Sequence, residues 1–209
     1  MKARCISSKN ETTKAIPVIG VFATCDPRIN PAARERAGNI VKTHADMLAD
    51  AIKLPDGRPV PVVYSDLLID SEKEVDKVAQ SFIAAGVTVL VGLPDTWSFP
   101  QLTLMSLLSH FPKETPLNFT CGNSGPKPGV VFTHAVSGAV AQTGRLMHIN
   151  VGTWPDDGMN PVMTEGTQQN TTVMLMRENV QTGSAILVPG LILVSALVII
   201  GAIIAFGRR

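Results

Sequence analysis

The sequence lacks the cysteine spacing of a disulfide framework or a zinc site. Its three cysteines, Cys5, Cys25 and Cys121, lie far apart, and none belongs to a Cys-x-x-Cys pair. Small disulfide-rich domains and structural zinc sites depend on such spacing. The sequence therefore favours a reducing compartment. We interpret Cys25 as a small buried thiol, because no histidine partner that would make it a nucleophile can be assigned.

A strong net charge is missing as well. The 18 Lys and Arg residues nearly balance the 17 Asp and Glu residues, and no basic cluster is interleaved with aromatic residues. Nucleic acid is therefore not an expected partner. The sequence also has no G-x-G-x-x-G after its first predicted strand and no P-loop, which argues against nucleotide binding. No two histidines are four residues apart, so we expect no metal site and structural or surface roles for His44, His110, His134 and His148.

Short apolar runs alternate with amphipathic segments along most of the chain. The predicted strands cover residues 16–23, 60–66, 87–93, 116–121 and 145–151. The predicted helices start at the cap pair Asn30–Pro31, at the capping box Ser71-x-x-Glu74, at Leu102 and at about Val130. This alternation predicts an α/β fold with a Rossmann-like or flavodoxin-like parallel sheet of about five strands and helices on both faces.

Two residues in the loops after the predicted strands stand out as candidates for ligand binding. Arg28 follows the first strand and could donate paired hydrogen bonds to hydroxyls or a carboxylate, or could instead pair with Asp26 to hold its loop. Trp97 follows the third strand between two prolines, where its ring could stack on the apolar face of a sugar or could seal the sheet edge. For Trp154 we favour packing.

The two ends of the chain differ from its centre. Residues 1–15 predict a disordered lead without a secretory signal, and residues 162–183 predict a linker. Residues 184–207 form an uncharged apolar run of about 35 Å as a helix, which is long enough to span a bilayer. Because Arg208 and Arg209 follow this run, we expect a single-pass C-terminal membrane anchor with the α/β domain on the cytoplasmic side.

Five segments occur in an order that is typical of one family. They read VIGVFATCDPRI, VVYSD, VLVGLPDTWSFPQ, GNSGPKPGVVFTHAVSGAVAQTG and HINVGTWPDD. On these segments, residues 16–161 resemble the N-terminal domain of the L-fucose isomerase family. The resemblance implies a domain that packs over a neighbouring subunit's active site in a homo-oligomer, with Arg28 and Trp97 helping to bind the sugar. The sequence departs from the family at Phe22 and Ile29, where the family has arginines.

The resemblance also implies chemistry that this chain does not carry. In the family, a Glu, an Asp and a His of later domains hold a manganese ion for the aldose–ketose isomerisation. We therefore expect no catalytic residue, metal or other cofactor in this chain. The expected protein is a truncated or divergent L-fucose isomerase-like protein that binds an L-fucose-like sugar, as a homo-oligomer or beside a separate catalytic chain. The alternative is a membrane-tethered interaction or sensor module without sugar chemistry.

Overall fold

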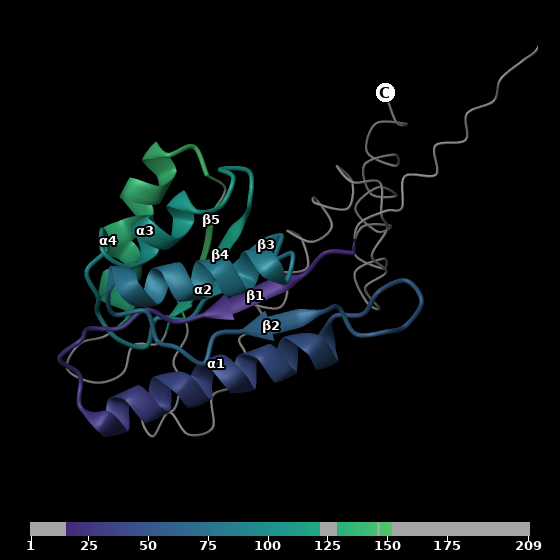
Figure 1. Ribbon diagram of the computed structural model, residues 1–209, viewed down its shortest axis with the longest axis horizontal. Coiled ribbons are helices and arrows are strands. Elements are labelled where there is room, and N and C mark those ends of the chain that lie inside the picture. The colour runs from purple at the N-terminus through teal and green to yellow at the C-terminus, as the bar shows by residue number, and fades with distance from the viewer. Residues whose placement is uncertain (1–15, 122–128, 146, 152–209) are drawn as a thin grey trace, which may run out of the picture.

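The computed structural model describes residues 16–121, 129–145 and 147–151, in which strands and helices alternate as the sequence predicts (Figure 1). The elements in chain order are β1 (Ile19–Phe22), α1 (Pro31–Ala51), β2 (Val62–Tyr64), α2 (Glu72–Ala84), β3 (Val89–Gly92), α3 (Leu104–Ser109), β4 (Leu117–Cys121), α4 (Gly129–Gln142) and β5 (Met147–Val151). The predicted parallel α/β fold is thereby confirmed.

The five strands form one parallel sheet in the order β2-β1-β3-β4-β5. This is the flavodoxin-like order, in which the chain turns back at the β1/β3 neighbours. Helix α1 covers one face of the sheet, and α2, α3 and α4 cover the other (Figure 1). The prediction of helices on both faces is therefore also confirmed.

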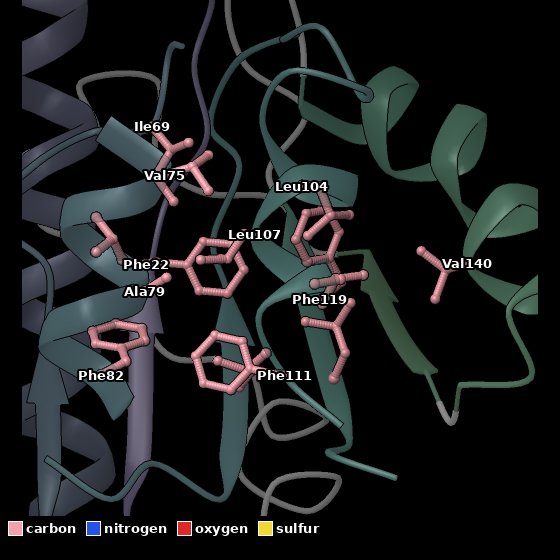
Figure 2. Close-up of a cluster of buried hydrophobic side chains, with 14 of the residues drawn as sticks. Phe22, Ile69, Val75, Ala79, Phe82, Leu104, Leu107, Phe111, Phe119 and Val140 are labelled. Atoms are coloured by element: carbon pink, nitrogen blue, oxygen red, sulfur yellow. The ribbon is translucent and has the colours of Figure 1, made fainter. Parts of the chain in front are cut away.

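The core on the face of α2, α3 and α4 is rich in aromatic rings (Figure 2). Phe22 lies 6.4 Å from Phe119, centroid to centroid, and Phe119 lies 5.9 Å from Phe132 of α4. Gly92 is required beside this series, because a Cβ at this position would overlap the ring of Phe119. The rings therefore continue without a gap from β1 across the sheet to α4.

Of the two predicted helix caps, the structure confirms the one at Asn30 but not the one at Ser71. Asn30 caps α1 as expected, since its Oδ1 accepts a hydrogen bond of 2.8 Å from the backbone N–H of Ala33. The hydroxyl of Ser71 instead donates to the carboxylate of Glu74, and its side chain makes no hydrogen bond to the backbone of α2. The predicted capping box is therefore not formed as expected, because its two side chains bond to each other and the Ser71 oxygen accepts no backbone N–H of α2.

Helix α3 is shorter than the predicted segment of residues 102–111. The backbone N–H groups of Leu102 and Thr103 both donate to the carbonyl oxygen of Phe99, which closes a turn in place of a first α-helical turn.

At the other end of α3, the buried side chain of Arg145 donates hydrogen bonds to four carbonyl oxygens. Its Nη1 donates to Pro112 and Thr115, and its Nη2 donates to Leu108 and Phe111.

His44 is the buried histidine of α1, and its Nδ1 lies 3.0 Å from the carbonyl oxygen of Ile40. Burial lowers its pKa, and the contact with Ile40 opposes this only in part. The unfolded chain therefore binds a proton below about pH 6.5 that the folded chain binds only at lower pH. The stability contributed by neutral His44 is fully present above that pH and is lost as the pH falls below it.

We expect the free energy of unfolding to decrease between pH 7.5 and pH 5.5, and His44→Gln to reduce this decrease. The limit for one group is about 1.4 kcal/mol per pH unit. Urea unfolding of both proteins at the two pH values measures the difference, and His134→Gln, on the exposed side of α4, is the matched control. An unchanged pH dependence in His44→Gln would refute the assignment.

Several predicted segments lie outside the described residues. They are the lead at 1–15, the end of the predicted domain at 152–161, Trp154, the linker at 162–183 and the apolar segment at 184–207. Within the part of the chain that the structure describes, no helix has the length and apolar character needed to cross a membrane. The membrane anchor therefore stays a prediction.

Candidate functional site

The candidate site lies where the carboxyl ends of β1 and β3 meet. Phe22 and Gly92, the last residues of these strands, are paired in register, and the backbone N–H of Leu93 donates to the carbonyl oxygen of Phe22. The two following loops therefore leave the sheet side by side, one toward α1 and the other toward α3. In open parallel sheets this switch point is where ligands bind.

Arg28, in the loop after β1, is held by Asp26. Its Nε donates to Oδ1 at 2.9 Å and its Nη2 donates to Oδ2 at 2.8 Å, so one edge of the guanidinium is fully used. Asp26 is completely buried, whereas 67% of the Arg28 side chain is exposed. The hydrogen bonds to Asp26 raise the pKa of Arg28, which stays cationic. The pairing with Asp26 is thus confirmed, and the outer part of the guanidinium still faces solvent.

Trp97, in the loop after β3, is partly buried. Its ring meets Phe132 of α4 edge to face, with centroids 6.0 Å apart and an interplanar angle of 85°. Two residues further on, the ring of Phe99 lies beneath the guanidinium of Arg28, 5.5 Å from its central carbon. The structure therefore brings Arg28 and Trp97 to the same pair of loops, with Phe99 as the link.

A largely buried ion pair that the sequence did not indicate joins α1 to the Trp97 loop. The Nε of Arg36 donates to Oδ2 of Asp95 at 2.8 Å, and Asp95 is fully buried. The carbonyl oxygen of Asp95 also accepts a hydrogen bond of 3.2 Å from the backbone N–H of Gly129 at the start of α4. Sequence patterns cannot reveal such a pair, because its two residues are 59 positions apart.

Cys25 does not suit the role of a nucleophile. It is fully buried in the loop after β1, and burial raises the pKa of its thiol to about 12. The thiol form therefore predominates at neutral pH, whereas a nucleophile needs the thiolate. The interpretation of Cys25 as a buried thiol is confirmed.

A groove of about 400 Å³ lies on the other side of β1, between α1 and the loop after β2. Arg34 of α1 forms an ion pair with Asp70 in this groove, and Glu35, Asp66 and Glu74 add three further carboxylates. The groove is therefore acidic. It contains neither Arg28 nor Trp97, so it is separate from the two predicted site residues.

Comparison with known proteins identifies the family of this chain. Residues 16–177 match the family model described as "L-fucose isomerase, first N-terminal domain". The chain belongs to this family. It is 29% identical to L-fucose isomerase of Bacteroides thetaiotaomicron over 134 residues, which cover 63% of this chain and 22% of that protein. The identity and the coverage are the same for L-fucose isomerase of Phocaeicola vulgatus. The chain is 26% identical to L-fucose isomerase of Streptococcus pneumoniae (strain Hungary19A-6) over 131 residues, which cover 61% of this chain and 21% of that protein.

The chain therefore spans about a fifth of the length of the L-fucose isomerases it matches. Arg28, Trp97 and the Arg36–Asp95 pair all lie within the matched L-fucose isomerase domain. Among residues 16–121, 129–145 and 147–151, no three His, Cys, Asp or Glu side chains are grouped in a way that could hold a metal ion. These residues of the L-fucose isomerase domain thus do not fit the manganese ion that the resemblance implies for the enzyme.

Proposed function

We propose that this domain binds a neutral sugar of the L-fucose class at the carboxyl edge of β1 and β3. Arg28 would donate hydrogen bonds to sugar hydroxyls, and Trp97 would offer its exposed ring surface to the apolar face of the sugar. The observation that carries the proposal is the exposed Arg28 guanidinium, fixed by Asp26 and by Phe99 on the same loop as Trp97.

The charges at this edge support a neutral ligand. Arg28 is matched by Asp26, and Arg36 is matched by Asp95, so neither arginine contributes a net positive charge. A phosphate or a carboxylate gains most where cations are in excess, whereas hydroxyls need only well-placed donors and acceptors. The pairing therefore favours a polyol over an anion.

We further propose that ketol isomerisation requires domains beyond the described residues. Moving a proton between two carbons of a sugar needs a base near the reacting carbon and a means of polarising the carbonyl. Arg28 and Trp97 can bind and orient a sugar but cannot act as such a base. The metal-bearing part would come from further domains or from a separate chain, in a homo-oligomer.

The sugar site is tested by titrating L-fucose against Trp154→Phe, in which Trp97 is the remaining tryptophan. We expect a saturable change in Trp97 fluorescence at millimolar sugar. In the same background, Arg28→Met should weaken binding about ten-fold or more, because a charged hydrogen-bond donor is lost.

Arg58→Met is the matched control for this experiment. Arg58 is also 67% exposed and also pairs with an aspartate two residues earlier, Asp56, but it lies in the turn after α1. Its replacement should leave the sugar affinity unchanged. Absence of any response to L-fucose, or equal weakening by Arg28→Met and Arg58→Met, would refute the proposed site.

The second candidate is a membrane-tethered module without sugar chemistry, and the uncharged apolar run at 184–207 favours it. We expect the full chain to stay with membranes after carbonate extraction and to be released by detergent. A chain ending at residue 183 should remain in the soluble fraction. Full release of the complete chain by carbonate would refute the anchor, and L-fucose titration separates this candidate from the first.

A further inference from the structure

Trp97 is held from outside its own loop at two independent places. On one side, the Arg36–Asp95 ion pair fixes the start of the loop, two residues before Trp97, to α1. On the other side, the ring of Phe132 of α4 meets the ring of Trp97 edge to face. The loop is therefore clamped between two helices that lie on opposite faces of the sheet.

The position of Phe132 is itself closely defined. Its side chain is fully buried, and its ring packs on Phe119 of β4 with centroids 5.9 Å apart. The start of α4 is joined to the same loop by the hydrogen bond from the Gly129 N–H to the carbonyl oxygen of Asp95, and it lies so close that a Cβ on Gly129 would overlap the carbonyl oxygen of Pro94. Helix α4 consequently cannot shift relative to the Trp97 loop without losing this close backbone contact.

Stability alone accounts poorly for these contacts. A buried ion pair is often no more stabilising than two apolar side chains of the same size, because both charges must leave water. Trp97, in turn, is only partly buried, so these contacts do not remove the whole residue from water. What the contacts do supply is a fixed orientation for the large ring of a partly buried residue.

We propose that Phe132 and Asp95 are positioning residues that hold the Trp97 ring ready to stack on a sugar. The inference rests on the proposed sugar site, and it adds the two side chains that prepare it. A ring that is fixed before binding loses less conformational freedom when the ligand arrives, which increases affinity. Neither positioning residue needs to touch the sugar.

The test uses Trp97 as its own reporter in the Trp154→Phe background. Phe132→Leu removes the edge-to-face contact, and Phe82→Leu is the matched control. Phe82 is just as buried in the same core, but it packs at α2 beside Gly20. Both variants should lose similar stability. Only Phe132→Leu should increase acrylamide quenching of Trp97 and weaken L-fucose binding, by about two- to ten-fold for an aromatic pair.

Asp95→Asn provides a second test that does not alter the aromatic core. Its control is Asp70→Asn, since Asp70 also pairs with an arginine of α1, Arg34, but outside the Trp97 loop. We expect Asp95→Asn to increase the quenching of Trp97 and Asp70→Asn to leave it unchanged.

Acrylamide quenching of Trp97 tests the positioning role independently of L-fucose binding. If the Trp154→Phe parent binds no L-fucose while Phe132→Leu and Asp95→Asn still expose Trp97, the proposed sugar site fails and the positioning of Trp97 stands. If Phe82→Leu changes Trp97 quenching as much as Phe132→Leu does, the positioning role is overturned. It is also overturned if Asp95→Asn and Phe132→Leu both leave quenching unchanged.

Discussion

Arg145→Met is expected to lower the free energy of unfolding by about 3 kcal/mol, one of the largest effects of any single substitution in the described fold. Arg145 is buried and donates hydrogen bonds to four carbonyl oxygens, at distances between 2.6 and 3.0 Å. Methionine fills a similar length but donates nothing, so these four oxygens would lose a charged donor in a region with little access to water. Urea unfolding monitored by circular dichroism measures the loss.

Arg58→Met is the control for this prediction as well. Both members of the Arg58–Asp56 pair are at least half exposed, and exposed pairs contribute little. Its effect should stay within about 0.5 kcal/mol. If Arg145→Met were equally mild, water or neighbouring donors would be replacing the guanidinium, and the four hydrogen bonds could not be called essential.

Two glycines of α4 should respond in opposite directions to the same substitution. Gly129→Ala would place a Cβ against the carbonyl oxygen of Pro94, and a backbone atom cannot move aside cheaply. We expect a loss of about 2 to 3 kcal/mol. Gly138→Ala places its Cβ where no atom lies within 4 Å, so it should raise stability by about 0.5 to 1 kcal/mol through helix propensity.

Thermal unfolding of the two variants and the parent measures both effects. Both substitutions replace a glycine of α4 by alanine. The difference between their effects on stability therefore reports the contact between α4 and the Trp97 loop. A neutral Gly129→Ala would show that α4 can move away from Pro94, and it would weaken the case that this helix fixes Trp97.

The strands and helices were largely predictable because each depends on local pattern. The apolar runs that became β1, β3 and β4 are buried along their whole length, as parallel strands between two helical layers must be. The start of α1 followed from Asn30 and Pro31 for equally local reasons. The Ser71 box was less predictable, since Ser71 and Glu74 can bond to each other instead of to the two backbone N–H groups that a capping box satisfies.

The candidate site was predictable only in part. Arg28 and Trp97 could be found because each follows a strand, and the pairing of Arg28 with Asp26 was foreseen because the residues are neighbours. The remaining contacts of the two residues join segments that are distant in the sequence. Phe99 reaches across to Arg28, and Phe132 comes to Trp97 from another helix.

Arg145 shows the same limit most clearly. It follows a helix in a stretch that reads as the start of a strand, and nothing nearby in the sequence indicates burial. Its acceptors lie 30 to 37 residues earlier, around the end of α3. Only the folded chain, in which Arg145 at the start of the β5 segment reaches the end of α3, brings the guanidinium to four carbonyl oxygens at once.

The strand order affects how this domain can fold while it is being synthesised on the ribosome. Strand β1 is synthesised first, yet it must wait for β2 on one edge and β3 on the other. At about 5 to 20 residues per second, the roughly 70 residues between Phe22 and Gly92 take about 4 to 14 seconds to appear. During that interval the strand that leads into the Arg28 loop has unpaired backbone on at least one edge, and such an edge is open to wrong pairing until β3 has been made.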